Sequence, residues 1–149
     1  MPNNRVQAER RAHWLRRKLE RNSGLYSDYK GFMADIIEKG YARKVPADFQ
    51  KSSVKWYIPH HGVYHPHKPG KIRVVFDCSP KYGGMSLNDQ LLKGLDLTNS
   101  PFGVLSRFRR ERIALMADIE AMFYQVRVVD ADSTYLRFLW CPMVGWTVT

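Results

Sequence analysis

Several features that would place a chain in a familiar class are scarce here. The 149 residues include two cysteines, Cys78 and Cys141, which are too few for a disulfide framework. Both are expected to be reduced, structural thiols of an intracellular protein. No apolar run approaches the roughly 20 residues of a membrane span, and no signal-peptide segment follows the first residues. The sequence therefore predicts no membrane partner.

Acidic residues and familiar catalytic signatures are scarce as well. The chain has no glycine-rich phosphate loop, no HExxH helix, no Ser/His/Asp arrangement and no Asp-Asp pair. Lys and Arg number 24 against 14 Asp and Glu, which gives a net charge of +10. This excess favours a polyanionic partner, most simply nucleic acid. A basic, solvated surface without a specific partner is the alternative.

What is present indicates a folded chain with helices first and strands later. The hydrophobic content of 44% is too high for a disordered composition, and the length suffices for one domain. Residues 1–24 are predicted to form a basic helix that ends at 22–24, because residues 1–22 carry half of the net charge. Its apolar face consists of Ala8, Ala12, Leu15 and Leu19. Its basic residues, which either face phosphate or are solvated, are Arg10, Arg11, Arg16, Arg17, Lys18 and Arg21.

A second helix and a β-hairpin are predicted next. An apolar stripe places the helix at about 28–39, with Gly40 as its C-cap. Residues 54–58 and 71–78 read as two strands joined by a long basic tip. Because side chains alternate along a strand, Arg73 and Asp77 are expected on the face opposite the core. The core side of the same strand would hold Ile72, Val74 and Phe76.

The second half of the chain suggests short helices and two further strands. A capped helix or turn is predicted at 86–94 and a helix from Pro101 onward. Residues 113–118 read as a buried strand that ends in Asp118. A carboxylate in that position is costly unless a hard cation such as Mg²⁺ compensates its charge; a surface acid is the alternative. A last strand is predicted at 135–141.

Four of the five histidines lie close together in the hairpin region. They are His60, His61, His65 and His67. Their spacing matches none of the usual zinc-finger patterns, although a zinc-binding adaptor remains an alternative reading. A polar hairpin tip that touches phosphate or solvent fits the pattern better. On the same hairpin, Lys68, Lys71 and Arg73 form a cationic group suited to phosphate.

Four ordered motifs run through the middle of the chain. Residues 57–63 read YIPHHGV, 68–77 read KPGKIRVVFD, 86–94 read SLNDQLLKG and 117–126 read ADIEAMFYQV. Together they resemble the reverse transcriptases of BEL/Pao-type LTR retrotransposons, and the first two look like the fingers hairpin of those enzymes. The resemblance covers about residues 25–141, and four motifs in order are far more specific than any one of them.

The resemblance implies an α/β (α+β) fold with N-terminal helices, a fingers β-hairpin and the first part of a palm. It also implies that Asp118 is the first of three catalytic carboxylates, which hold two Mg²⁺ ions for an in-line displacement. Phe123 would be the aromatic gate that crowds a ribose 2′-OH and selects deoxynucleotides. The expected activity is that of an RNA-directed DNA polymerase, a nucleotidyltransferase.

Further roles follow from the same resemblance. Arg73 would lie over the incoming base and contact its phosphates, and either Lys68 or Lys71 would contact the β- and γ-phosphates. Gln125 would lie near the template or primer strand. The implied partners are an RNA/DNA template-primer, a dNTP and the rest of a polyprotein with its palm, thumb, RNase H and integrase. Such a protein would occupy the cytoplasm, the nucleus or a virus-like particle.

Departures from the family limit what is expected of this chain alone. The Asp-Asp pair that completes the metal site is missing, and residues 142–149 no longer match. We therefore divide the sequence into a basic helix (1–24), a fingers and partial palm region (25–141) and a non-matching tail (142–149). Without the rest of the palm, Leu136, Phe138 and Trp140 are expected to lack their usual cover. A non-catalytic nucleic-acid-binding remnant or domesticated module is the alternative function.

Overall fold

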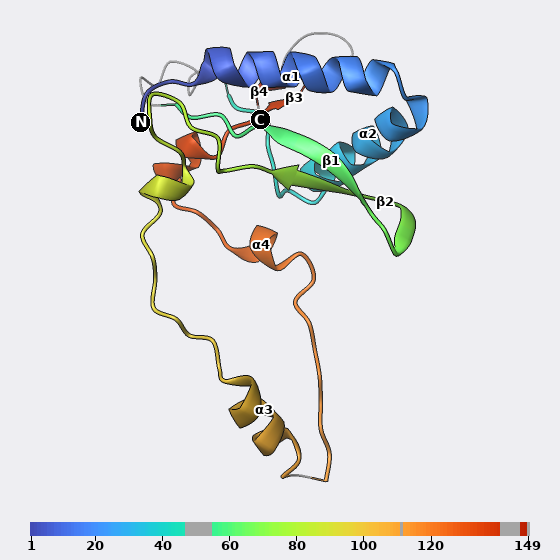
Figure 1. The fold of residues 1–149 in the computed structure, drawn as a ribbon, viewed down its shortest axis with the longest axis vertical. Helices are drawn as coiled ribbons and strands as arrows, with labels where there is room; N and C mark the ends of the chain where they lie inside the picture. The colour runs from blue at the N-terminus through green and yellow to red at the C-terminus, as the bar shows by residue number, and fades with distance from the viewer. Residues whose placement is uncertain (47–54, 111, 141–146, 149) are drawn as a thin grey trace. The chain divides into compact units, whose positions relative to one another are not determined.

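Helices and short antiparallel sheets make up the fold, which is α+β in its general class (Figure 1). The computed structural model describes residues 1–46, 55–110, 112–140 and 147–148. The chain divides into unit 1 (Met1–Gln90 and Val128–Thr149) and unit 2 (Leu91–Arg127). The α-helices are α1 (Arg5–Glu20), α2 (Ser23–Glu38), α3 (Pro101–Phe108) and α4 (Met122–Gln125). The strands are β1 (His60–His65), β2 (Lys68–Phe76), β3 (Leu139–Trp140) and β4 (Thr147–Val148), with 3-10 helices at Asn88–Gln90 and Asp132–Tyr135.

The junction between α1 and α2 is tighter than the sequence predicted. Helix α1 ends at Glu20. The segment 22–24, which was expected only to end α1, also begins α2, five residues before the predicted start of that helix. The side chain of Asn22 accepts a hydrogen bond of 2.9 Å from the backbone N–H of Leu25. Asparagine is a strong N-cap because it satisfies a backbone donor that the first helical turn leaves free. Asn22 therefore ends one helix and begins the next.

The apolar stripe of α2 forms the centre of the core of unit 1. Tyr29, Met33 and Ile36 are buried, and Leu19 of α1 packs beside them, as the helical spacing predicted. Gly40 follows α2 with φ of 72°, a left-handed conformation that glycine adopts without strain. Its N–H donates to the Ile37 carbonyl at 3.0 Å. Gly40 therefore ends α2 as predicted, one position after the C-cap residue Lys39.

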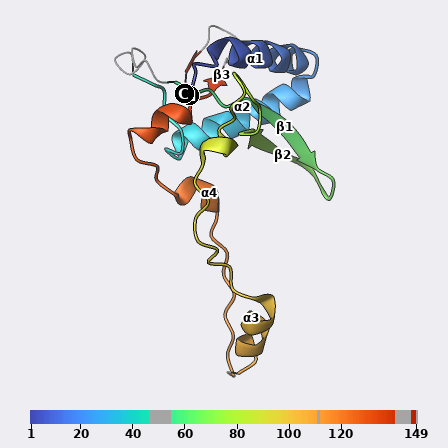
Figure 2. The ribbon, with the colours of Figure 1, turned by 60° about the vertical axis from the view of Figure 1, so that its left-hand side comes forward.

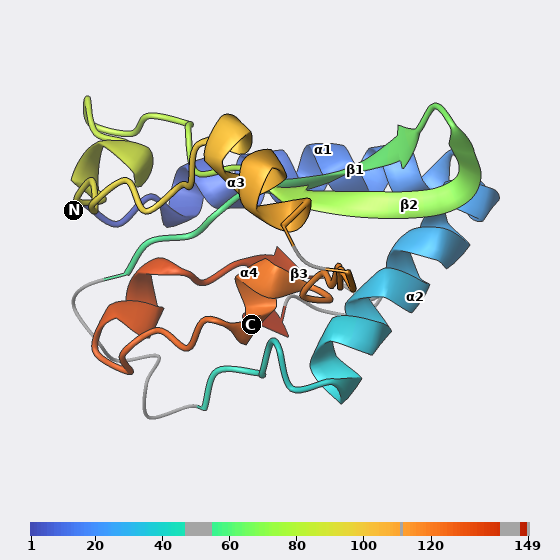
Figure 3. The ribbon, with the colours of Figure 1, turned by 90° about the horizontal axis from the view of Figure 1, so that it is seen from below.

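The β-hairpin uses the histidine-rich segment as a strand. Strand β1 pairs antiparallel with β2, and the turn lies at Pro66 and His67 (Figure 3). The prediction of a long tip between strands at 54–58 and 71–78 is wrong: the tip residues pair, and only the 55–58 part of the first predicted strand lies within the described residues. There, Tyr57 makes an isolated bridge to Arg137. The proline at 66 ends β1, whereas Pro69-Gly70 lies inside β2 beside a register shift at Tyr64 and His65.

Strand β2 alternates as predicted, and it packs on α2 (Figure 2). Val74 is buried and Ile72 and Phe76 are partly buried against the core, whereas Arg73 is exposed. The expectation that Phe138 and Trp140 lack cover is wrong. Both side chains are buried, because α2 and the hairpin supply the cover: Trp140 stacks on Tyr29 with ring centroids 5.4 Å apart.

Gly62 is the one glycine of the hairpin that the core itself requires. A Cβ built there would lie 2.8 Å from Ile72 Cδ1 and 3.1 Å from Tyr29 Cδ2. Ile72 can move, but Tyr29 is fully buried and its ring has no room to shift. We expect Gly62→Ala to lower the free energy of unfolding by about 1–3 kcal/mol, measured by urea denaturation.

Gly31 in α2 provides a matched control for that prediction. It is exposed, and nothing lies within 4 Å of a Cβ built there. Gly31→Ala is expected to raise the free energy of unfolding by about 0.5–1 kcal/mol, because alanine is the better helix former. Equal effects of the two substitutions would show that the close approach at Gly62 carries no strain.

Unit 2 contains α3 and α4 joined by irregular chain. Pro101 opens α3, as predicted, and suits the first helical position because its missing N–H needs no partner there. The predicted strand at 113–118 is wrong: residues 113–119 form neither helix nor strand and are exposed. A strand needs a neighbour for its backbone hydrogen bonds, and no pairing among the described residues includes this segment. Within the described residues, no helix is long and apolar enough to cross a bilayer.

Candidate nucleic-acid interface

The outer face of the hairpin carries the first group of predicted site residues. In β2, Lys71 and Arg73 are exposed on the side that faces away from the core. Arg73 pairs with Val63 of β1 across the sheet, and the exposed His61 pairs with Val75 two residues along. Lys68 begins β2, but its side chain lies outside the described residues. The hairpin therefore brings Lys71 and Arg73 together on a rigid, cationic face.

Asp77 lies directly after this face and is held by a turn. Its Oδ1 accepts hydrogen bonds from the Ser79 N–H at 3.0 Å and from the Ser79 hydroxyl at 2.6 Å. These bonds favour the charged form, and with help from His61 and Arg11 they lower the pKa of Asp77. Asp77 is therefore a satisfied structural acid at the end of β2.

Asp118, the predicted catalytic and metal-binding carboxylate, lies in the irregular part of unit 2. Its side chain is exposed, and it ends the segment 113–118, which was expected to be a strand but is irregular. Within the described residues, no group of three or more His, Cys, Asp or Glu side chains lies close enough together to hold a metal ion. A two-ion site needs several carboxylates that converge on both ions. The described residues therefore do not make up the Mg²⁺ site that the resemblance implies.

Phe123 and Gln125 lie in the short helix α4 of unit 2. Phe123 is 81% exposed, so its ring is presented to solvent. Gln125 Nε2 donates to the Glu120 carbonyl at 3.2 Å and thereby closes the turn that leads into the helix. Ala121 precedes α4 with φ of 52°, an uncommon conformation for a residue with a side chain. These two residues share a unit with Asp118, whereas Lys71 and Arg73 belong to unit 1.

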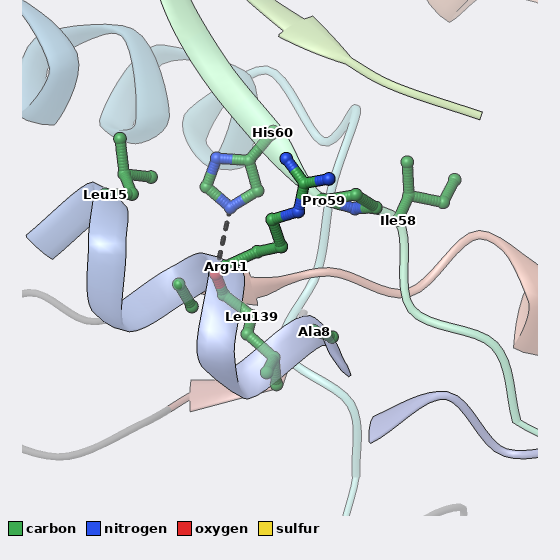
Figure 4. Close-up of a pocket in the computed structure, with 8 residues that line it drawn as sticks. Ala8, Arg11, Leu15, Ile58, Pro59, His60 and Leu139 are labelled. Carbon is green, nitrogen blue, oxygen red and sulfur yellow. Dashed lines mark hydrogen bonds between the residues drawn. The ribbon is translucent and has the colours of Figure 1, made fainter. Parts of the chain in front are cut away.

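His60 was predicted to lie in a polar hairpin tip, but it is a buried core residue (Figure 4). Its Nε2 lies 2.9 Å from the Leu139 carbonyl, which can only accept, so Nε2 carries the proton. Its Nδ1 then accepts from the Tyr29 hydroxyl. Burial lowers the pKa of His60 to about 4 and raises that of Tyr29. Both ring nitrogens are used, so His60 has none left for a zinc ion.

The sequence does indicate that His60 is buried, but only if residues 60–65 are recognised as a strand. In β1 the residues His60, Gly62 and Tyr64 alternate with His61 and Val63, and cross-strand pairing places His60 opposite Phe76. The Phe76 and Phe138 rings lie 5.5 Å from that of His60, centroid to centroid. An alternating reading of 60–65 would have put His60 on the core face.

Comparison with known proteins adds no identification. No family model, no curated protein and no solved structure matches the chain. The exposed cationic face of the hairpin and the four sequence motifs are therefore the observations on which a function can be argued.

Proposed function

We propose that this chain is the fingers and first palm segment of an RNA-directed DNA polymerase of the BEL/Pao retrotransposon type. In this proposal it binds a template-primer duplex and a dNTP through the cationic face of the hairpin. The observation that supports this most directly is the alternation of β2. It buries Val74 and leaves Lys71 and Arg73 exposed side by side, within the KPGKIRVVFD motif.

The chemical suitability of this face follows from its residues. Arg presents a planar fork of donors that matches phosphate, and Lys adds a point charge. Both stand on a strand of a two-stranded sheet that packs on α2, so their backbone positions are fixed by the core. Nucleotide addition itself would require two Mg²⁺ ions, and the ligand set for them exceeds what Asp118 provides.

A non-catalytic nucleic-acid-binding module is the second candidate. It is favoured by the exposed, irregular setting of Asp118, where the described residues assemble no metal cluster. Both candidates predict binding to nucleic acid, but only the first predicts that the chain supports nucleotide addition when a complete palm is supplied.

Salt dependence tests the binding that both candidates share. With Lys71 and Arg73 each on a phosphate, the affinity for an RNA–DNA duplex should fall about tenfold between 50 and 200 mM salt. Arg73→Gln should reduce the log–log salt slope by about one unit, because one phosphate contact is lost. Fluorescence anisotropy with a labelled duplex measures both quantities.

Arg43→Gln is the matched control for this test. Arg43 follows α2 and is exposed, so the substitution removes the same charge from another part of unit 1. Its slope should equal that of the unsubstituted chain. If Arg43→Gln and Arg73→Gln change the slope equally, the net charge rather than the hairpin face governs binding, and this part of the proposal is wrong.

A further inference from the structure

Helix α1 presents an exposed tryptophan in the middle of a row of cations. Residues three and four apart lie on the same side of a helix. Trp14 is 71% exposed, and the basic residues around it are exposed as well. We call this surface the Trp14 stripe; it consists of Arg10, Arg11, Trp14, Arg17, Lys18 and Arg21. The stripe lies outside the four motifs and outside residues 25–141, so the proposed function assigns it no role.

The two acids of α1 do not neutralise this stripe. Glu9 accepts from Arg5 at 2.8 Å and Glu20 accepts from Arg16 at 2.7 Å, each over one helical turn. These pairs lie along the other exposed flank of the helix. In the part of the chain that the structure describes, no ion pair joins Arg10, Arg17 or Lys18 to an acid. The positive charge of α1 is therefore concentrated around Trp14.

The surroundings of Trp14 are open and fixed in place. Gln7, Arg10, Arg11 and Trp14 line an open hollow on α1. Gln7 Nε2 donates to the Lys81 carbonyl at 2.9 Å, which holds the 77–90 segment against this end of the helix. On its opposite face α1 is anchored by Ala8 and Leu19, which are buried in unit 1. A large aromatic ring is thus left in water on a helix that the core holds rigid.

We propose that the Trp14 stripe binds a single-stranded stretch of RNA or DNA. Trp14 stacks on an unpaired base, while Arg10, Arg17 and Lys18 contact the phosphates on either side. Exposed aromatic rings within a cationic surface bind single strands in this way, because every base offers a flat face and every nucleotide a negative charge. In a duplex the bases already stack on one another, so the same surface favours unpaired strands.

A lipid surface fits this helix less well. A helix that lies on a membrane buries a broad apolar face among the lipids. The apolar face of α1 is already buried in the core through Ala8, Leu19 and their neighbours. Apart from Trp14, only Val6 is a large exposed apolar side chain on α1. The stripe therefore offers charge and one ring, which suits a base and its phosphates.

Two double variants of equal charge test the phosphate contacts. Arg10→Gln/Arg17→Gln changes the stripe, and Arg5→Gln/Arg16→Gln removes two charges from the opposite flank. Binding of the 149-residue chain to a fluorescent 20-nucleotide oligo(U) is measured over 50–200 mM salt, and circular dichroism confirms that both variants fold. The stripe variant should flatten the log–log slope by about 1.4 units, because each contact with a single strand contributes about 0.7. The flank variant should leave the slope unchanged; equal slopes would overturn the proposal.

Substitution of Trp14 separates stacking from charge. Trp14→Ala should weaken oligo(U) binding roughly tenfold at every salt concentration without a change in slope, and Trp14→Phe should recover most of the loss. In a Trp146→Phe background, oligo(U) should quench the emission of Trp14, because Trp56 and Trp140 are buried. Unchanged affinity of Trp14→Ala for oligo(U), an equal loss of its affinity for a 20-base-pair duplex, or quenching by phosphatidylserine vesicles but not by oligo(U) would each show the proposal to be wrong.

Discussion

No template-dependent primer extension is expected from the 149-residue chain, with either Mg²⁺ or Mn²⁺. Two-metal catalysis needs carboxylates that converge on a pair of ions roughly 3.5–4 Å apart. Asp118 is exposed in an irregular segment, and the described residues assemble no cluster of three metal-binding side chains. Loss of the metal clamp removes several kcal/mol of transition-state stabilisation, and each 1.4 kcal/mol is worth about tenfold in rate.

The assay for this prediction uses purified, monomeric protein, a labelled DNA primer on an RNA template and all four dNTPs. A heat-inactivated sample sets the background, and a complete reverse transcriptase confirms that the substrates are competent. Asp118→Asn should leave both the background extension and the Mn²⁺ affinity of the chain unchanged. Extension above background that Asp118→Asn abolishes would show that the chain does assemble a metal site, and the prediction would be wrong.

Local sequence signals predicted the helices of unit 1 and the two faces of β2 well. The stripe of α2, its end at Gly40 and the alternation of β2 are all set by residues within a few positions of each other. The capped helix or turn predicted at 86–94 holds for its first part, a 3-10 helix at Asn88–Gln90. There Asp89 accepts from the Ser86 N–H, and the Ser86 hydroxyl accepts from the Asp89 N–H. Each of these features follows from neighbouring side chains and needs no distant partner.

The failed predictions concern elements whose state depends on distant partners. The segment 60–65 became a strand because β2 pairs with it, although its histidines and glycine suggested a loop. Residues 113–118 have a strand-like composition, yet they pair with nothing among the described residues. Trp140 is covered by Tyr29, which lies 111 positions earlier in the chain. The hydrophobic pattern shows which secondary structure a segment prefers, but not which other segment is available to pair or pack with it.

The predictions about the candidate site also succeeded where they depend on neighbouring residues and failed where they depend on distant ones. The sequence placed Lys71 and Arg73 on one exposed face, because both lie on a single strand. Asp118 differs, because the strand that was expected to carry it needs a distant partner, and no pairing among the described residues includes its segment. Trp14 was overlooked because a lone aromatic residue on a helix usually belongs to the core, and only its exposure shows otherwise.

Acidification from pH 7 to pH 4.5 is expected to destabilise the fold through His60. Burial holds the pKa of His60 at about 4 in the folded chain, against 6.5 for an exposed histidine. The unfolded chain therefore binds a proton more readily between these values. The contribution of neutral His60 to the free energy of unfolding is complete above about pH 6.5 and is lost as the pH falls toward 4. The total loss is on the order of 3 kcal/mol. That is a large share of the 5–15 kcal/mol typical of a small domain.

The structural cause lies in the hydrogen bonds of His60. A proton on Nδ1 would meet the Tyr29 hydroxyl, which now donates to that nitrogen, and the charge would sit among Phe76, Phe138 and Trp140. The charged groups near His60 do little to stabilise its protonated form. His61 on β1 would repel the new charge, and Arg11 of α1 lines the same small hollow as His60. Protonation therefore favours release of His60 from the core, and with it the bond to Leu139 that ties β1 to β3.

Urea denaturation at pH 7.0, 6.0, 5.0 and 4.5 measures this effect, and two variants assign it. His60→Gln keeps a donor and an acceptor but cannot be protonated, so its free energy of unfolding should change little over this range. His61→Gln, next to it on the exposed face, should keep the full decline. Asp77, whose pKa the hydrogen bonds from Ser79 hold below its usual 3.8, also loses stabilisation on acidification, but mostly at pH values below this range. A decline that persists in His60→Gln would place the acid sensitivity elsewhere in the chain.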